Sequence, residues 1–408
     1  MKKLYEVTFR LDPKDCPGEV KTAGLRGEFL FYKSGLTGHT DQTGMVDCTE
    51  KFPPSQYRED LDNIGGIYYV PMEKNADGIF EKTLRLPAGA YPYQFVLNPE
   101  LCEPDPDPDP LMSWIVMTLD DGSQKGLKDF MAAMEGKTDY NRMIPDPKNL
   151  PAAPTVTGPQ RNSICYVGTR EDNFRMPMDD PTKRGTITYL SYEDVDGATQ
   201  SIAVYLPAGY DRAKTYPLVL VSHGGGGNEA DWPVQGSIGS VMDNLIAQGR
   251  ACEAVLVCMN NSVYSWDYAK IARNCEEKII PFVEKLFSVS RSASDRAFCG
   301  LSMGSMTTLY MYMHRAAVYD YFGAFSGGLA GGEHFTLEDP HLADVVLMIG
   351  SAEEDIAYNE QEIGVPPTIR ALQARGLPFI PYFVTGSHDW FCWPEMFAYF
   401  AEHVLWKK

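Results

Sequence analysis

Short apolar runs alternate with amphipathic segments of helical spacing from residue 186 to the end of the chain. Several runs are continuously apolar, as in Pro217–Val221, which is typical of strands covered on both faces of a sheet. Strands that alternate with helices in this way predict a mainly parallel sheet flanked by helices. The predicted strands are Thr186–Leu190, Ser201–Leu206, Pro217–Val221, Ala254–Cys258, Arg296–Cys299, Val345–Ile349 and Phe379–Val384.

The first hundred residues have a different rhythm, in which polar and apolar positions alternate between clusters of Gly, Pro and Asp. This pattern predicts strands joined by turns. Ser163–Val167 is expected to be the last strand of this part, and the Pro-rich stretch Pro145–Pro159 a connector. We therefore expect an all-β domain over residues 1–168 and an α/β domain over residues 183–408. The other predicted strands are Gly27–Tyr32, Gly66–Val70 and Phe80–Leu86, and the run Leu86–Leu97 adds a tight turn and another strand.

The acidic composition narrows the classes of partner. A net charge of −19 and a pI near 4.8 argue against binding to nucleic acid or to an anionic membrane, because long-range repulsion opposes the encounter. Glu6 and Arg10 interrupt the apolar core that a secretory signal would need, so a cytoplasmic location is expected, with secretion left open if residues are missing. The nine cysteines show no metal-binding spacing and are expected to be reduced.

A candidate nucleophile follows the predicted strand Arg296–Cys299. Gly300-Leu301-Ser302-Met303-Gly304 has the G-x-S-x-G pattern of a sharp turn from strand to helix, which would hold the Ser302 hydroxyl above the sheet edge. The two glycines are needed where a side chain would clash. An ordinary glycine-rich turn is the alternative interpretation of this short pattern alone.

A base and an acid for Ser302 are expected at the same sheet edge. His388 follows the last predicted strand directly, and the acidic stretch Glu353-Glu354-Asp355 follows the strand before it. Asp355 is our choice for the acid, with Glu354 and then Glu353 as alternatives. The chain order Ser302, Asp355, His388 is that of α/β-hydrolases.

Acyl transfer also needs donors for a tetrahedral oxyanion. The glycine-rich turn His223-Gly224-Gly225-Gly226-Gly227 after a predicted strand could supply the amides of Gly224 and Gly225, with the amide of Met303 as a third donor. A phosphate or dinucleotide loop is the rival interpretation, but neither G-x-x-x-x-G-K-[ST] nor G-x-G-x-x-G occurs there. No cofactor or metal is expected.

Together these motifs resemble carbohydrate esterase family one, the feruloyl and acetyl-xylan esterases, whose relatives include enterochelin esterase. Asp77–Phe80 through Val96 is similar to the immunoglobulin-like module, related to glycogen-binding domains, that precedes many carbohydrate esterases. The resemblance implies an α/β-hydrolase fold behind an immunoglobulin-like sandwich, and serine ester hydrolysis without a metal or organic cofactor. The motifs that carry it are Val204–Tyr210, His223–Asn228, Gly300–Gly304, Phe325–Gly328 and Gly386–Trp390.

The function that this resemblance implies is release of hydroxycinnamic (ferulic-type) or acetyl groups from sugar esters of plant polysaccharide fragments. A siderophore esterase, an acyltransferase and a carbohydrate-binding protein with a relict hydrolase domain remain alternatives. Four tryptophans near the expected site could line a pocket for a flat aromatic acid; they are Trp232, Trp266, Trp390 and Trp393. The acyl group, the sugar and the oligomeric state are left open by the sequence.

Overall fold

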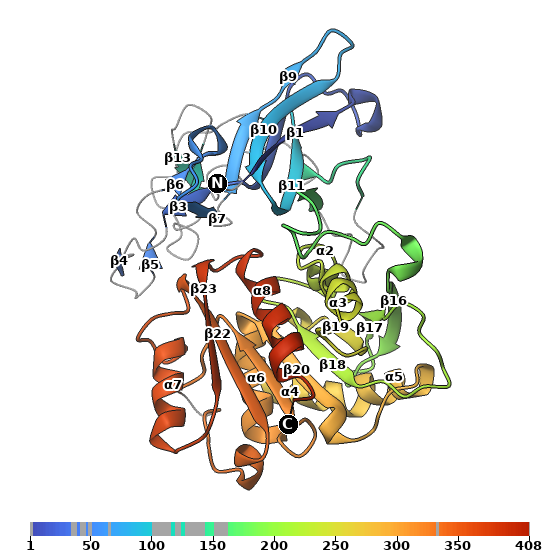
Figure 1. Cartoon of the computed structure of the whole chain (residues 1–408), viewed down its shortest axis with the longest axis vertical. Helices are drawn as coiled ribbons and strands as arrows, with labels where there is room; N and C mark the ends of the chain where they lie inside the picture. Colours follow the sequence, from blue (N-terminus) through green and yellow to red (C-terminus); the bar gives the residue numbers. More distant parts are fainter. Residues whose placement is uncertain are drawn as a thin grey trace. The chain divides into compact units, whose positions relative to one another are not determined.

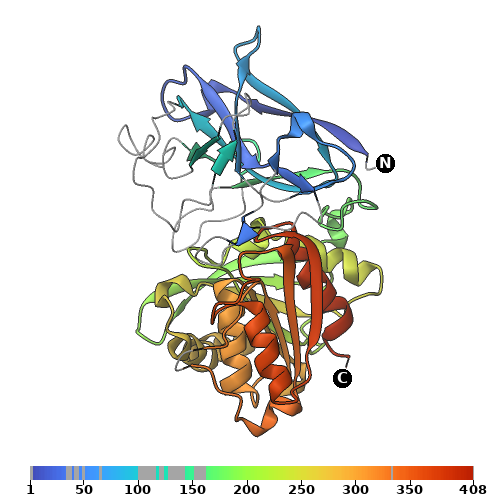
Figure 2. The same cartoon turned by 90° about the vertical axis from the view of Figure 1, so that its left-hand side faces the viewer.

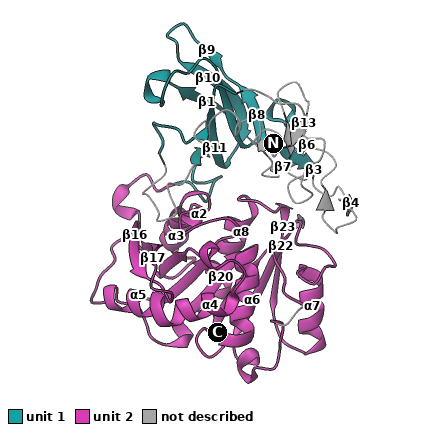
Figure 3. Ribbon diagram, turned by 180° about the vertical axis from the view of Figure 1, so that it is seen from behind, with its two compact units in different colours: residues 1–37, 47–152, 160–176 teal, residues 38–46, 153–159, 177–408 magenta. Residues whose placement is uncertain are grey.

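The computed structural model describes residues 3–33, 39–40, 46–47, 51–63, 67–99, 116–118, 124–126, 143–150, 162–331 and 334–407. The chain divides into two compact units, shown in teal and magenta in Figure 3. Unit 1 comprises residues 1–37, 47–152 and 160–176, and unit 2 comprises residues 38–46, 153–159 and 177–408. The expected domain limits at residues 168 and 183 fall on either side of the division after residue 176. Residues 151–159 of the expected connector lie outside the described residues.

Unit 1 is built from mostly antiparallel strands (blue to teal in Figure 2). Strand β11 is central to its largest sheet, because it pairs with β2, β14 and β15. The expected strand Gly27–Tyr32 is instead two strands, since the Phe29 amide donates to the carbonyl of Gly27 and turns the chain. The sheets of unit 1 have the orders β1(Leu4–Leu11)-β10(Phe80–Pro87)-β9(Glu73–Lys74), β13(Gln124–Gly126)-β12(Val116–Thr118)-β8(Ile67–Pro71)-β2(Ala23–Glu28)-β11(Gly89–Leu97)-β14(Met143–Ile144) with β15(Ser163–Val167) on β11, and β6(Lys51–Phe52)-β3(Phe31–Lys33)-β7(Leu61–Asn63). The strand pair β4(His39–Thr40)-β5(Val46–Asp47) belongs to unit 2 except for Asp47.

Unit 2 contains the expected α/β architecture, an eight-stranded sheet flanked by helices (Figure 1). β17 pairs antiparallel with both of its neighbours, β16 and β19, and the other five pairs of adjacent strands are parallel. β21 was not among the strands expected from the sequence. The sheet order is β16(Thr186–Glu193)-β17(Thr199–Leu206)-β19(Val255–Met259)-β18(Leu218–Ser222)-β20(Arg296–Leu301)-β21(Tyr321–Phe325)-β22(Val346–Glu354)-β23(Ile380–Ser387).

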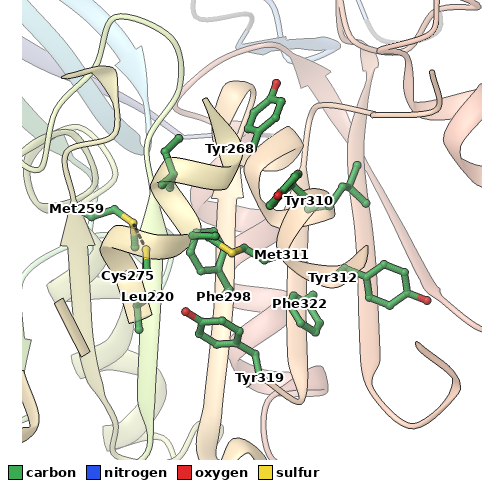
Figure 4. Close-up of a cluster of buried hydrophobic side chains, with 14 of the residues drawn as sticks. Leu220, Met259, Tyr268, Cys275, Phe298, Tyr310, Met311, Tyr312, Tyr319 and Phe322 are labelled. Carbon is green, nitrogen blue, oxygen red and sulfur yellow. Dashed lines mark hydrogen bonds between the residues drawn. The ribbon is translucent and has the colours of Figure 1, made fainter. Parts of the chain in front are cut away.

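Helices pack on both faces of this sheet. On one face α3 contacts α8, and on the other α4 contacts α6, the central helix. Figure 4 shows the core under α6, where Phe298, Met311 and Phe322 fill the space between helix and sheet. The helices are α2(Asp231–Val234), α3(Ile238–Ala247), α4(Tyr268–Asn274), α5(Ile280–Leu286), α6(Met303–Arg315), α7(Val365–Ala374) and α8(Cys392–Tyr399), with π turns at Cys275–Ile279 and Phe400–Val404.

Four polar residues come directly after four parallel strands of unit 2. His223 follows β18, Ser302 follows β20, Asp355 follows β22 and His388 follows β23. The carboxyl ends of parallel strands share one edge of a sheet, which is where α/β proteins place their sites. The topology therefore brings residues up to 165 positions apart to a single rim. Among the helices of the described segments, we found none with the length and apolar character needed to cross a bilayer.

Candidate active site

Ser302 occupies a strained turn between β20 and α6. Its backbone angles, φ of 53° and ψ of −117°, lie in a region that residues other than glycine rarely adopt. The nucleophile elbow of α/β-hydrolases has a strained turn of this kind. The Ser302 amide donates to the Phe325 carbonyl at 2.9 Å, which ties the turn to β21. A Cβ on Gly300 would lie 2.8 Å from the backbone of Gly304, and one on Gly304 would lie 2.6 Å from the His223 carbonyl oxygen. The two glycines are thus required by the close approach of β18, β20 and α6.

His388 forms hydrogen bonds with both other candidate residues. Its Nδ1 lies 2.8 Å from Oδ1 of Asp355 and its Nε2 lies 3.0 Å from Oγ of Ser302. An ionised carboxylate only accepts, so Nδ1 carries the hydrogen and Nε2 is free to accept from the Ser302 hydroxyl. The structure therefore brings Ser302, His388 and Asp355 into the arrangement in which an imidazole can take the proton of a serine.

Asp355 is completely buried and remains an acid of low pKa. Burial alone would raise the pKa of its carboxyl, but the adjacent His388 imidazole and the hydrogen bonds that it accepts outweigh this and hold the pKa below its usual value. One of these bonds comes from the Ala357 amide at 2.8 Å. A buried carboxylate that stays ionised fixes the imidazole and stabilises the imidazolium that forms during proton transfer.

The acid lies closer to the end of its strand than the sequence suggested. Strand β22 was expected to stop at Ile349, but it continues to Glu354 with a break in its register against β23 between Ala352 and Glu354. Asp355 is therefore the first residue beyond the strand. The described contacts assign the Nδ1 partner of His388 to Asp355.

The glycine-rich turn lies against Ser302. A Cβ on Gly224 would sit 3.3 Å from the Cβ of Ser302, whereas the space around Gly225 is open. Within the described residues, the hydrogen bonds do not include an acceptor for the N–H of Gly225 or Met303. Free amides beside a nucleophile are the requirement for an oxyanion hole.

The four tryptophans differ in their surroundings. Trp232 is buried against Trp390, Phe325 and Phe397, and its indole N–H donates to the Ser222 carbonyl at 2.9 Å. It is a core residue, and the expectation that it lines a pocket is corrected. Trp266 is 56% exposed on the loop after β19, and Trp393 packs edge-on against the His388 ring with centroids 5.0 Å apart.

We expect Trp232→Phe to lower the free energy of unfolding by about 2 kcal/mol, because it leaves a buried carbonyl without its donor and a small cavity. KM for an ester should not change. Trp266→Phe is the control and should alter stability by less than about 0.5 kcal/mol, since its ring is mostly in solvent. Urea unfolding followed by circular dichroism measures both. A raised KM with unchanged stability in Trp232→Phe would return this residue to the pocket.

Asp389, next to His388, is a second buried carboxyl at this rim. Its Oδ1 accepts from the amides of Phe391 and Cys392 at 2.8 and 3.1 Å, at the start of α8. Burial raises its pKa to about 6 despite these hydrogen bonds, and the charge of Asp355 adds to the rise. The sequence motif Gly386–Trp390 contains this residue, but only its burial distinguishes it from a solvent-exposed cap.

We expect Asp389→Asn to stabilise the protein at alkaline pH. A pKa near 6 in the folded state lies above the ordinary value, so the ionised carboxylate lowers stability above about pH 6, and this cost disappears as the pH falls toward about 4. Asparagine keeps the acceptor oxygen and removes the charge. The free energy of unfolding should rise by up to about 3 kcal/mol at pH 8 and be unchanged near pH 4. Equal effects at both pH values in urea titrations would contradict this.

In the described part of the chain, no three His, Cys, Asp or Glu side chains gather closely enough to hold a metal ion.

Two features of the site were not predicted from the sequence. The first is strand β21, whose last residue Phe325 anchors the Ser302 turn. Its signal was the apolar run Tyr321–Phe325 before the quoted Ser326 motif. The contact of Trp393 with His388 had no sequence signal beyond proximity to the histidine.

Residues 197–398 match the model of a protein family described as "Putative esterase". The matched residues all lie in unit 2. The match runs from two residues before β17 into α8, so Ser302, Asp355 and His388 all lie within the matched region.

Two curated relatives each match part of the chain. The endo-1,4-beta-xylanase/feruloyl esterase of Xylanibacter ruminicola is 29% identical over 236 residues, which are 54% of this chain and 31% of that protein. Endo-1,4-beta-xylanase Y of Acetivibrio thermocellus is 29% identical over 154 residues, which are 35% of this chain and 14% of that protein. The chain thus spans less than a third of the length of either relative.

Two solved structures are similar in fold. A ferulic acid esterase from Anaeromyces mucronatus in complex with ferulic acid is 25% identical, covers 56% of this chain and 94% of its own, and has a TM-score of 0.50. The enterobactin esterase of Shigella flexneri is 14% identical, covers 97% of this chain and 91% of its own, and also has a TM-score of 0.50. Unit 2 therefore has an α/β-hydrolase type of fold. The immunoglobulin-like assignment of unit 1 stays a prediction.

Proposed function

We propose that the protein is a serine carboxylic-ester hydrolase in which Ser302 is the nucleophile, His388 the general base and Asp355 the residue that orients the base. The observation that carries this proposal is the chain of hydrogen bonds from Asp355 Oδ1 through His388 to Ser302 Oγ, at 2.8 and 3.0 Å. All three residues lie in the region that matches the family model described as "Putative esterase", which supports the proposal.

In the proposed reaction, the Ser302 hydroxyl oxygen bonds to the ester carbonyl carbon as its proton passes to His388 Nε2. The carbonyl oxygen becomes an anion, stabilised by amides among those of Gly224, Gly225 and Met303. The tetrahedral species collapses by breaking the bond to the leaving alcohol, which takes the proton from His388. Water then repeats these steps on the acyl-enzyme, releasing the acid and restoring Ser302.

For substrates, we propose hydroxycinnamoyl (ferulic-type) or acetyl esters of sugars. The match to a relative named as a xylanase/feruloyl esterase and the fold of a ferulic acid esterase support this class. A planar aromatic acid is suited to an aromatic surface, and we propose that Trp266, Trp390 and Trp393 contribute to that surface. Trp393 is the strongest of the three, since it touches His388.

A siderophore esterase is the second candidate function, because the enterobactin esterase structure extends over 97% of this chain. The two candidate functions differ in the ester that the enzyme prefers.

The test is a panel of esters assayed on the purified full chain, comprising methyl ferulate, 4-nitrophenyl acetate, feruloylated and acetylated xylo-oligosaccharides, and a tri-catechol lactone. We expect the highest kcat/KM on a ferulate or acetyl ester. Preference for the lactone would favour the second candidate, and hydrolysis of no ester, with no labelling of Ser302 by a fluorophosphonate, would reject both.

A further inference from the structure

His223 is a buried histidine that the proposed reaction does not use. It follows strand β18 and is 1% exposed. Its Nε2 lies 2.9 Å from the backbone nitrogen of Asn261. A backbone N–H can only donate, so Nε2 accepts and the imidazole hydrogen is on Nδ1.

The same histidine is held in its neutral form. Burial lowers its pKa to about 4, although a hydrogen bond to Gly224 and the carboxylate of Glu229 both favour the charged form. Glu229 is itself completely buried and accepts a hydrogen bond from the Ser201 hydroxyl. One tautomer of a neutral ring is therefore present at physiological pH.

The Nδ1–H of His223 reaches the carbonyl oxygen of Gly224, at a distance of 2.6 Å. The Gly227 amide donates to the same oxygen at 3.3 Å. A trans peptide unit is planar, with its C=O and N–H pointing in opposite directions. Two donors that hold the Gly224 oxygen therefore also set the direction of the Gly225 N–H.

That N–H belongs to the peptide that borders the nucleophile. Gly224 is packed against Ser302, and Gly225 is exposed, with open space around its Cα. In the described structure the Gly225 N–H has no acceptor within the protein. The direction of the Gly225 N–H is therefore fixed by its peptide unit while the hydrogen has no acceptor among the described residues. Such a preorganised donor can stabilise a developing negative charge without a cost of reorientation.

We propose that His223, as a neutral Nδ1–H tautomer, is a positioning residue that aims the Gly225 N–H at the oxyanion formed on attack by Ser302. This inference rests on the proposed function. Of the two candidate donors in the glycine-rich turn, we select the Gly225 N–H rather than the Gly224 N–H. The reason is that the Gly225 N–H shares a peptide unit with the Gly224 carbonyl, whose oxygen is held by two hydrogen bonds. Asn261 takes part through its amide, which selects the tautomer, and through its side chain, which donates to the Ser222 hydroxyl at 2.8 Å.

The kinetic test compares two variants of equal shape. Asparagine at 223 places an amide nitrogen near the position of Nδ1 and can donate to Gly224, whereas leucine cannot. We expect His223→Leu to lower kcat on 4-nitrophenyl acetate about 100-fold with KM changed less than about threefold, as for loss of an oxyanion donor. His223→Asn should keep at least about a third of the wild-type kcat. Inhibition by a boronic acid, which forms a tetrahedral adduct on serine, should weaken in parallel with kcat in the leucine variant.

Wild-type kcat in His223→Leu, or equal losses in the two variants, would overturn the proposal. A second measurement does not require folded variants or ester hydrolysis. In protein labelled with ¹⁵N-histidine, the ring of residue 223 should show the Nδ1–H tautomer and no titration between about pH 5 and 8. An Nε2–H tautomer or an imidazolium in that range would refute the inference. If no ester is hydrolysed but the tautomer is as expected, the proposed function fails while the anchoring of Gly224 by His223 stands.

Discussion

Ser302→Ala should reduce kcat on methyl ferulate and 4-nitrophenyl acetate by about 10⁴- to 10⁶-fold, the largest loss expected for any single substitution in this protein. Without the hydroxyl, no acyl-enzyme can form, and the residual rate comes from amides that still polarise the carbonyl. Because alanine removes only one oxygen atom, and Ser302 makes no side-chain hydrogen bond that caps α6, the fold should be retained. Initial rates measure kcat, intact-protein mass spectrometry after fluorophosphonate treatment measures labelling of residue 302, and circular dichroism measures retention of the fold.

Ser305→Ala is a matched control on the same helix. The Ser305 hydroxyl is buried and donates to the Gly327 carbonyl at 2.8 Å. Its loss should cost about 1 kcal/mol of stability and leave ester hydrolysis and fluorophosphonate labelling intact. Wild-type turnover in Ser302→Ala would instead remove the nucleophile from the proposal, and with it the role of the whole site.

Asp355→Asn should lower kcat by about 10⁴-fold while the protein stays folded, which is the second largest effect that we expect. An asparagine can present its NH₂ to the imidazole, which favours the tautomer with hydrogen on Nε2. That tautomer cannot accept the Ser302 proton. The loss of the carboxylate also removes the charge that stabilises the imidazolium. The measurement is the pH dependence of kcat/KM on 4-nitrophenyl acetate, in which activity should recover in part where hydroxide replaces the base.

Two neighbouring carboxylates serve as controls for Asp355→Asn. Glu354→Gln tests the alternative acid raised by the sequence, and Asp389→Asn removes the other buried carboxyl of the His388 loop. Both should keep kcat within about threefold of wild type, since the two ring nitrogens of His388 are bonded to Asp355 and Ser302. A large loss in Glu354→Gln with activity retained in Asp355→Asn would reverse the assignment of the acid.

Local sequence patterns predicted much of the structure of unit 2. Gly300 and Gly304 flank Ser302 because backbone and side-chain atoms come within 3 Å of where their Cβ atoms would be, and this requirement is readable as G-x-S-x-G. Continuous apolar runs indicated the buried parallel strands, which require apolar residues on both faces. Once the strands were in place, the first residues after them became candidates for one rim, in the order Ser302, Asp355, His388.

Unit 1 was less accessible to this reasoning. The sequence pattern of apolar and polar positions between turn residues predicted several of its strands, including β10, β11 and β15. The strand expected over Gly27–Tyr32 is divided by the Phe29 amide bonding back to Gly27, and an i to i−2 backbone contact of this kind has no characteristic residue pattern. Which strands pair, as in the contact of β11 with β2 and β15, depends on non-local packing.

The amino-acid sequence by itself determined the α/β class of unit 2 and all strands of its eight-stranded sheet except β21, the glycine-flanked turn at Ser302 and the chain order of the three candidate residues, because these follow from local periodicity and sterics. Only the tertiary structure decided which of three adjacent carboxylates meets His388, since that depends on the register break near the end of β22. It also decided that Trp232 is core and that His223 holds one tautomer. Burial and hydrogen-bond partners are set by residues distant in the chain, so no local pattern encodes them.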